Sequence, residues 1–376
     1  MQNIVDRIVD LAIQIQQIPA PTFHESKRAE FVRNSFVEEG LQDVMIDDVG
    51  NVYGFLVQNE RQRQDTKPLI VSAHLDTVFP LETDLSVKRE DDKVYGVGIG
   101  DNSLGVAGLF GLIWMLRERH VDYADAPLGA KHGDIWFVAN VGEEGLGDLR
   151  GMKAVADRFG EDVLAYLVLE GMALGHVYHK AVGVKRYRIT ATTQGGHSWS
   201  DYGQPSAVLE LTRLIRQMTS LRLPSRPRTT MNVGKINGGT SINVIPAEAW
   251  LELDLRSEGP DELADLVERV ERLIEGAGRP GVRIEAKVIG ERPAGELSPR
   301  HPLIKLAQTC LHKQGLDTAL TSGSTDANIP LSRGYPALVL GVTKGGGAHT
   351  KNEFIEVQPL EKGLQQLVRF FEMVWE

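Results

Sequence analysis

Short apolar segments alternate with longer amphipathic segments over the first and last parts of the chain. Apolar residues recur every three or four positions in residues 4–16, which predicts an amphipathic helix, and a similar helical pattern covers residues 25–39. The intervening apolar runs, residues 69–71, 135–141 and 164–169, are continuous rather than alternating. Continuous runs of this kind are typical of strands buried on both faces, as in the parallel sheets of α/β proteins.

The pattern changes near residue 181, where polar and apolar side chains begin to alternate. Such alternation predicts strands of a sheet with one exposed face. The expected elements are a strand at 184–193, a helix at 205–221, strands at 230–236 and 249–255, a helix from Pro260, and a strand at 282–289. This strand-helix-strand-strand-helix-strand order is the ferredoxin-like arrangement of an α+β domain.

The α/β pattern returns after residue 295, with a helix from Pro302, an apolar strand at 337–340 and a final helix at 360–375. We therefore predict one α/β domain with a mostly parallel central sheet, interrupted by a small α+β insert of ordinary domain size. The expected boundaries are residues 1–180 and 293–376 for the two parts of the main domain, and 181–292 for the insert.

Composition excludes several classes of function. The 376 residues carry a formal net charge of -10 without a basic cluster, which argues against nucleic-acid binding. A single cysteine excludes an intrachain disulfide and a thiolate metal cage. Residues 1–6 lack the pattern of a signal peptide, and the longest apolar run, residues 106–116, is too short to span a membrane. We expect a soluble cytoplasmic protein that binds no membrane.

Ionisable side chains follow four of the predicted strands. In open α/β sheets the carboxyl ends of the strands form the ligand-binding crevice, so groups at these ends converge although they are distant in sequence. The groups are His74 and Asp76 after the first strand, Glu143 and Glu144 after the second, Glu170 after the third, and His349 after a glycine loop that follows the fourth. A fifth element is Asp101, in the glycine-rich loop 96–102.

Imidazole and carboxylate donors without thiolate favour Zn²⁺, Mn²⁺ or Co²⁺ over a structural zinc site. Two histidines and three carboxylates are enough for two ions if one carboxylate bridges them, and a further carboxylate can then act as a general base. Taken singly, a histidine or an acidic pair after a strand is more often a packed or solvated residue. The prediction of a metal site depends on the convergence of all of these groups.

The same residues form ordered motifs that resemble metallopeptidase family twenty of clan MH. This family includes carboxypeptidase G, peptidase T, acetylornithine deacetylase, succinyl-diaminopimelate desuccinylase and the aminoacylases. The motifs are His74-Leu75-Asp76-Thr77-Val78, Asp101-Asn102, Gly142-Glu143-Glu144-Gly145, Glu170 and His349. The resemblance extends over nearly the whole chain. It implies a zinc-exopeptidase-like catalytic domain, with the insert as a lid and dimerisation domain.

The resemblance also implies a role for each metal ligand. His74 and Glu170 would bind one ion, Glu144 and His349 would bind the other, and Asp101 would bridge the two. Zinc is the expected metal, with cobalt or manganese as alternatives.

Two further roles follow from the resemblance. Asp76 would support His74, and Glu143 would act as the general base on a metal-bridged water and then as proton donor to the leaving amine. Exchange of the roles of Glu143 and Glu144 is the simplest alternative. The peptide between Asp101 and Asn102 is often cis in this family.

The insert contains three candidate residues by the same resemblance. His197, in Gly195-Gly196-His197-Ser198, would stabilise the oxyanion in the active site of a neighbouring subunit, which implies a homodimer. Asn243 would contact the substrate, and Arg256 would bind a substrate carboxylate as a planar bidentate donor. From the residues alone, the alternative for Arg256 is a surface arginine at a strand end.

We therefore expect a di-metal hydrolase that cleaves an amide bond in a small peptide or N-acyl amino acid, of carboxypeptidase or deacylase type. Glu170 favours this type, because family aminopeptidases such as peptidase T tend to carry aspartate at the corresponding position. An aminopeptidase or dipeptidase of the peptidase T type is the alternative among enzymes. A non-catalytic metal- or ligand-binding protein on the same scaffold is the alternative outside them.

Overall fold

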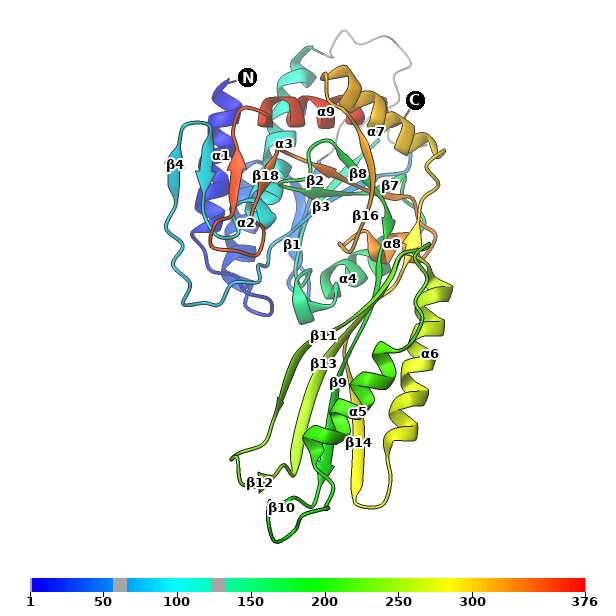
Figure 1. Ribbon diagram of the computed structural model, residues 1–376. Coiled ribbons are helices and arrows are strands. Elements are labelled where there is room, and N and C mark those ends of the chain that lie inside the picture. The colour runs from blue at the N-terminus through cyan, green and yellow to red at the C-terminus, as the bar shows by residue number, and fades with distance from the viewer. Residues whose placement is uncertain (1, 57–65, 123–132, 376) are drawn as a thin grey trace. The chain divides into compact units, whose positions relative to one another are not determined.

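The computed structural model describes residues 2–56, 66–122 and 133–375. The chain forms two compact units, which are drawn in Figure 1. The first unit contains Met1–Ala181 and Glu296–Glu376, and the second contains Val182–Gly295.

The first unit is built around a mixed sheet whose order is β1-β2-β6-β3-β7-β17-β8-β15, in which β15 is Gly295–Glu296 and β16 also pairs with β8. Its four central strands, β6, β3, β7 and β17, are all parallel, which confirms the predicted mostly parallel α/β sheet. The strands are β1 (Gln42–Ile46), β2 (Val52–Leu56), β3 (Leu69–His74), β6 (Ile135–Asn140), β7 (Ala165–Glu170), β8 (His176–Ala181), β16 (Ala319–Gly323) and β17 (Ala337–Gly341).

Helices cover both faces of this sheet, as the continuous apolar strands require (Figure 1). Successive strand residues point to opposite faces, so Leu69 and Val71 enter one core and Ile70 enters the other. The first core also contains α1 (Gln2–Gln16), α2 (Ser26–Glu38), α3 (Leu104–Asp122), α7 (Pro302–Lys313) and α9 (Leu360–Met373). The second core contains α4 (Arg150–Phe159) and α8 (Asn328–Ser332).

One stretch of the first unit, Ile99–Glu118, is long and apolar enough to cross a membrane by composition alone. Its apolar window is 89% buried inside the protein, as in the core helix of a soluble fold. The predicted cytoplasmic location stays a prediction.

A small antiparallel sheet, of order β18-β19-β5-β4, brings the last candidate ligand loop beside the glycine-rich loop. Its strands are β4 (Lys88–Glu90), β5 (Lys93–Tyr95), β18 (Gly345–Gly346) and β19 (Phe354–Glu356). Because β19 pairs with β5, the segment before β19 lies against the segment after β5. Those two segments carry His349 and Asp101.

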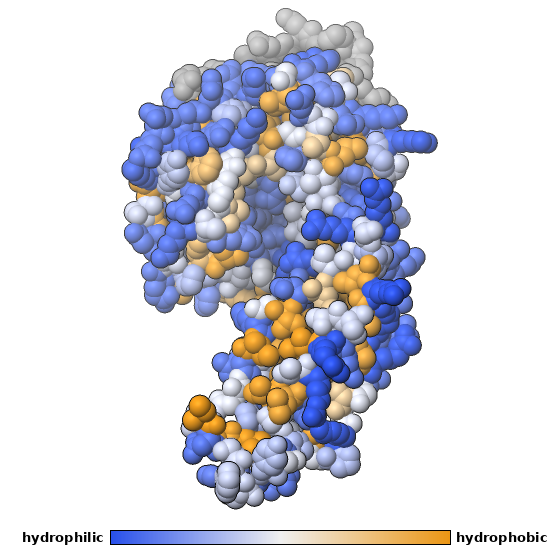
Figure 2. All heavy atoms as spheres, viewed as in Figure 1, coloured by the Kyte–Doolittle hydropathy of each residue, from blue (hydrophilic) through white to orange (hydrophobic). Residues whose placement is uncertain are grey.

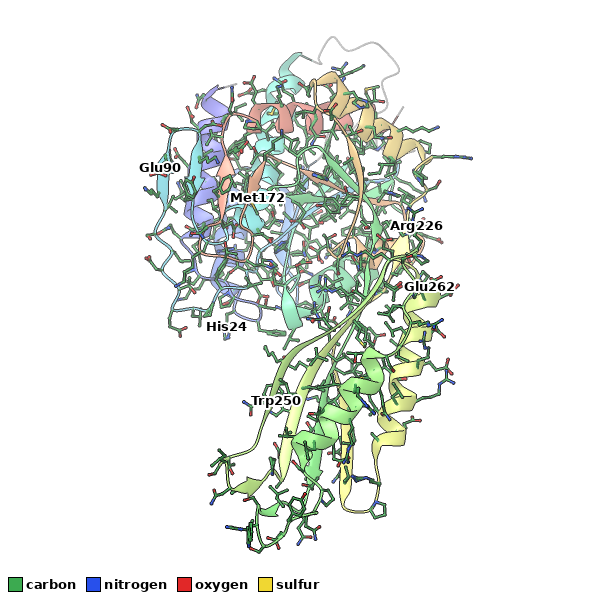
Figure 3. All side chains as sticks on the ribbon, in the orientation of Figure 1. His24, Glu90, Met172, Arg226, Trp250 and Glu262 are labelled. Carbon is green, nitrogen blue, oxygen red and sulfur yellow. The ribbon has the colours of Figure 1, made fainter. Side chains whose placement is uncertain are left out.

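The second unit has the predicted ferredoxin-like order. Its antiparallel sheet, β11-β13-β9-β14, packs one face against two helices through an apolar core. The elements are β9 (Gly183–Thr193), α5 (Ala207–Thr219), β11 (Thr229–Gly238), β13 (Glu248–Ser257), α6 (Pro260–Ala277) and β14 (Val282–Arg292). The opposite face is polar, and Trp250 on that face (Figure 3) has the guanidinium of Arg188 stacked 4.0 Å from its ring centroid.

Two short strands, β10 (Gly196–His197) and β12 (Val244–Ile245), pair with each other outside the main sheet of the second unit. Figure 2 shows apolar surface at the end of the unit that carries them. Trp199, Tyr202 and Ile242 are the most exposed large apolar side chains in the described residues. All three lie in the segments next to β10 and β12.

Candidate metal centre

The parallel strands place their candidate ligands at one edge of the sheet. β3 ends at His74 and β7 ends at Glu170, while β6 ends at Asn140, three residues before Glu143. The register sets His74 opposite Asn140, and the end of β17 opposite Glu170. The strand ends therefore converge as the sequence predicts.

Within the described residues, two groups of histidine and carboxylate side chains have ligand atoms within 4.8 Å of one another. The first group is His74, Asp101 and Glu170. The imidazole Nε2 of His74 lies 3.1 Å from Asp101 Oδ1 and 3.9 Å from Glu170 Oε2. His74 is 1% exposed, so its orientation is fixed by packing.

The second group is Asp101, Glu144 and His349. The imidazole Nε2 of His349 lies 3.1 Å from Asp101 Oδ2 and 2.9 Å from Glu144 Oε1. Asp101 thus belongs to both groups, and each of its carboxylate oxygens faces a different histidine. The peptide between Asp101 and Asn102 is cis, as the family resemblance implies.

Buried negative charge dominates this cluster. Burial raises the pKa of Glu170 well above its ordinary value, and the nearby Asp101 and Glu143 raise it further. Burial opposes the charged form of His74, but its hydrogen bonds with carboxylates raise its pKa well above the ordinary value. Hydrogen bonds with Asp101 and Glu144 raise the pKa of His349 to about 10. The carboxylates of the cluster thus stabilise positive charge at His74 and at His349, as expected of a donor set for two divalent cations.

Asp76 links the first strand end to the glutamate pair. Its fully buried carboxylate accepts hydrogen bonds from the backbone N–H groups of Glu143 and Glu144, each at 2.9 Å, and from the Thr22 hydroxyl at 2.8 Å. The Nδ1 of His74 lies 3.0 Å from the Asp76 carbonyl oxygen and 3.6 Å from its carboxylate. The carboxylate therefore fixes the backbone of the glutamate pair as well as approaching His74.

We expect the Asp76→Asn variant to lose about 10–100-fold in metal affinity or activity, the usual cost of removing a residue that orients ligands. The amide must point its NH₂ group at one of the N–H donors, so the glutamate pair loses an anchor. Zn²⁺ affinity measured by competition with a chelator would test this. Asp84→Asn is a matched control, because Asp84 accepts a backbone N–H on the exposed surface. Equal affinities in both variants would contradict the expectation.

Two supporting residues were not identified from the sequence. The buried Asn102 donates to the carbonyl of Leu169 at 2.9 Å and accepts from the N–H of Gly171 at 3.0 Å, so it holds both neighbours of Glu170. The buried Glu353 accepts three backbone N–H bonds from the glycine-rich loop. Burial raises the pKa of Glu353 to about 7, and the N–H donors act in the opposite direction. Asn102 directly follows Asp101 and Glu353 lies four residues after His349, but neither position indicates which backbone groups the side chain would bind.

The candidate residues of the second unit lie at two separate places. The exposed His197 is on β10, and Asn243 directly precedes its partner strand β12. The carbonyl of Asn243 accepts a 3.0 Å hydrogen bond from the N–H of Ser198, so the two motifs are adjacent. Arg256 lies near the far end of β13, where its Nε donates to Asp254 at 2.6 Å.

The chain is similar to known proteins over most of its length. The model of the peptidase family M20/M25/M40 matches residues 70–373. The uncharacterized protein YqjE of Bacillus subtilis (strain 168) is 24% identical over 379 residues, which cover 97% of this chain and 98% of YqjE.

Solved structures share the fold over the full length. A tripeptidase from Staphylococcus aureus is 22% identical with a TM-score of 0.80, and the match covers 98% of each chain. Aminopeptidase PepT from Bacillus cereus is 22% identical with a TM-score of 0.78, and the match covers 99% of each chain.

Proposed function

Because the chain belongs to the peptidase family M20/M25/M40 and is a metal-dependent hydrolase, we propose that it cleaves an amide bond in a small peptide or N-acyl amino acid by a di-metal mechanism. One observation carries this proposal. The two carboxylate oxygens of Asp101 each lie 3.1 Å from a different imidazole, the arrangement expected of a ligand shared by two ions.

His74 and Glu170 would hold one ion, Glu144 and His349 the other, and Asp101 both. Zinc is the first candidate, since imidazole and carboxylate donors without thiolate suit an open catalytic zinc site, and cobalt or manganese are alternatives. When bound, such ions polarise a substrate carbonyl and lower the pKa of water.

Glu143 would be the general base. It is 6% exposed and belongs to neither candidate ligand group. Its charge nevertheless raises the pKa of both His74 and Glu170, which places its carboxylate near the first group. Asp76 holds its backbone. From this position the carboxylate of Glu143 would take a proton from the attacking water and then give it to the nitrogen of the leaving amine.

His197 would stabilise the oxyanion, and the hydrogen bonds of its ring support this role. Its Nδ1 accepts hydrogen bonds from the backbone N–H groups of Trp199 at 3.2 Å and Ser200 at 3.4 Å. A neutral imidazole whose Nδ1 is an acceptor carries its proton on Nε2. His197 would therefore present an Nε2–H donor to the developing negative charge on the substrate oxygen.

The positions of His197 and Arg256 within the second unit support a homodimer. His197 lies beside the Glu248 end of β13, whereas Arg256 is eight positions farther along that strand, about 26 Å at the usual rise per residue. A small substrate cannot contact both side chains of one copy. We propose that His197 and Asn243 act on a substrate bound by the partner chain, while Arg256 binds the substrate carboxylate.

Glu170 supports the carboxypeptidase or deacylase type within this family. The names of the solved neighbours, a tripeptidase and an aminopeptidase, support the peptidase T type as the second candidate. The two candidates differ in the free terminal group that the substrate must carry. An aminopeptidase requires a free amine next to the scissile bond, whereas a carboxypeptidase or deacylase requires a free carboxylate.

A hydrolysis screen with the metal-reconstituted protein tests the proposal. We expect N-acyl amino acids and N-blocked dipeptides to be cleaved, and their C-terminal amides to be poor substrates. Arg256→Met should raise KM for the free acids about tenfold or more, because a hydrogen bond to a charged group is lost. Arg283→Met, at an exposed arginine on β14, is the control.

Cleavage restricted to substrates with a free amine would establish the aminopeptidase alternative instead. Metal binding without hydrolysis of any member of the screen would favour the non-catalytic binding protein.

A further inference from the structure

The side chain of Glu353 is completely buried, four residues after His349 and directly before β19. Its Oε2 accepts a hydrogen bond from the N–H of Gly98 at 2.9 Å. Its Oε1 accepts from the N–H groups of Gly100 at 2.8 Å and Asp101 at 2.9 Å. Its backbone carbonyl accepts a fourth bond, from Gly96 at 3.0 Å. One residue thus satisfies four donors of the loop that carries Asp101.

The loop is shaped around this carboxylate. Gly98 has a φ of +69°, a left-handed conformation that turns the following N–H groups inward to form a concave anion site. Met172, labelled in Figure 3, packs against the outside of the loop, where a Cβ added to Gly100 would lie 2.4 Å from its sulfur. Met172 therefore packs closely against the loop at Gly100, and the carboxylate of Glu353 provides the hydrogen-bond acceptor for the loop's N–H groups.

We propose that Glu353 is a positioning residue that holds Asp101 between His74 and His349, so that both metal positions depend on it. This inference rests on the proposed di-metal function. Glu353 is bonded to the backbone of Asp101 itself, and Asp101 belongs to both ligand groups. Loss of Glu353 therefore weakens the binding of both ions, whereas loss of Glu170 weakens one.

The test is a titration of the metal-free protein with Zn²⁺ in competition with a chelator, repeated with Co²⁺ and its absorption spectrum. In Glu353→Gln the amide NH₂ faces one of the N–H donors, and we expect about 10–100-fold weaker affinity for both ions. Glu170→Gln should weaken one ion only. Glu356→Gln, three residues along the chain on β19, is the matched control and should bind as the parent does.

Thermal unfolding and far-UV circular dichroism establish whether each variant is folded. If Glu353→Gln does not fold, Glu353→Asp replaces it, because the shorter side chain keeps the charge but cannot reach all three donors. Two unchanged affinities in a folded variant would overturn the inference, as would a change confined to one ion.

The affinity test of Glu353 is independent of the hydrolysis test of the proposed function, because metal affinity is measured without substrate. A parent protein that binds two ions but hydrolyses no substrate removes the proposed catalysis and leaves the role of Glu353 testable by affinity. A parent protein that is active, with unchanged affinities in the Glu353 variant, removes only the inference.

Discussion

Glu143→Ala is expected to lower kcat about 10²–10⁴-fold, the usual contribution of a positioned general base, while the variant still binds its full complement of metal. Glu143 lies beside the first ligand group but outside both, so its removal leaves the donors in place. Steady-state hydrolysis and metal analysis on the same preparation measure the two properties together.

Glu144→Ala is the matched comparison, since the carboxylate of Glu144 lies 2.9 Å from His349. That variant should lose affinity for one ion as well as activity. If Glu143→Ala lost the metal and Glu144→Ala kept it, the roles of the two glutamates would be exchanged. A Glu143→Ala variant as active as the parent would exclude Glu143 as the base.

Asp101→Ala should weaken the binding of both ions by more than about 100-fold, beyond the usual cost of losing a residue that only supports a ligand. No other residue of the described chain belongs to both ligand groups. Removing Asp101 also removes the one carboxylate that lies close to both imidazoles, those of His74 and His349. The measurement is the number of Zn²⁺ ions retained per chain after dialysis, by elemental analysis.

Glu170→Ala, which alters the first group alone, is the control for Asp101→Ala. It should retain one ion per chain. An Asp101→Ala protein that kept one ion with the affinity of the parent would show that the two groups are independent, and Asp101 would then not be shared.

The fold of the first unit could be predicted where strands are buried on both faces. Continuous apolar runs such as 69–71 and 135–141 are short and bounded by polar residues, which favours strands buried in a parallel sheet, and the carboxyl ends of such strands meet at one edge. The edge strand β1 could not be predicted in this way. Its short apolar run, Val44 to Ile46, follows two polar residues and lies on an edge strand, where the residues are exposed or half-buried and are not enclosed on both faces.

The candidate ligands could be predicted because each follows a strand end or a glycine loop. Their supports could not, because they depend on contacts between loops distant in the chain. Glu353 accepts hydrogen bonds from a loop 252 to 255 residues earlier, and nothing in the sequence around it indicates this contact. Asp76 both approaches His74 and accepts hydrogen bonds from the backbone of the glutamate pair. This arrangement depends on two strand ends that lie side by side, which the spacing of residues in the sequence does not reveal.

The most direct measurement is a titration of the metal-free protein with Zn²⁺ while hydrolysis of an N-acyl amino acid is followed. We expect no hydrolysis before metal is added, and activity that rises until two ions are bound per chain. Full activity in the metal-free protein, or saturation of both binding and activity at a single ion, would contradict a di-metal centre shared through Asp101.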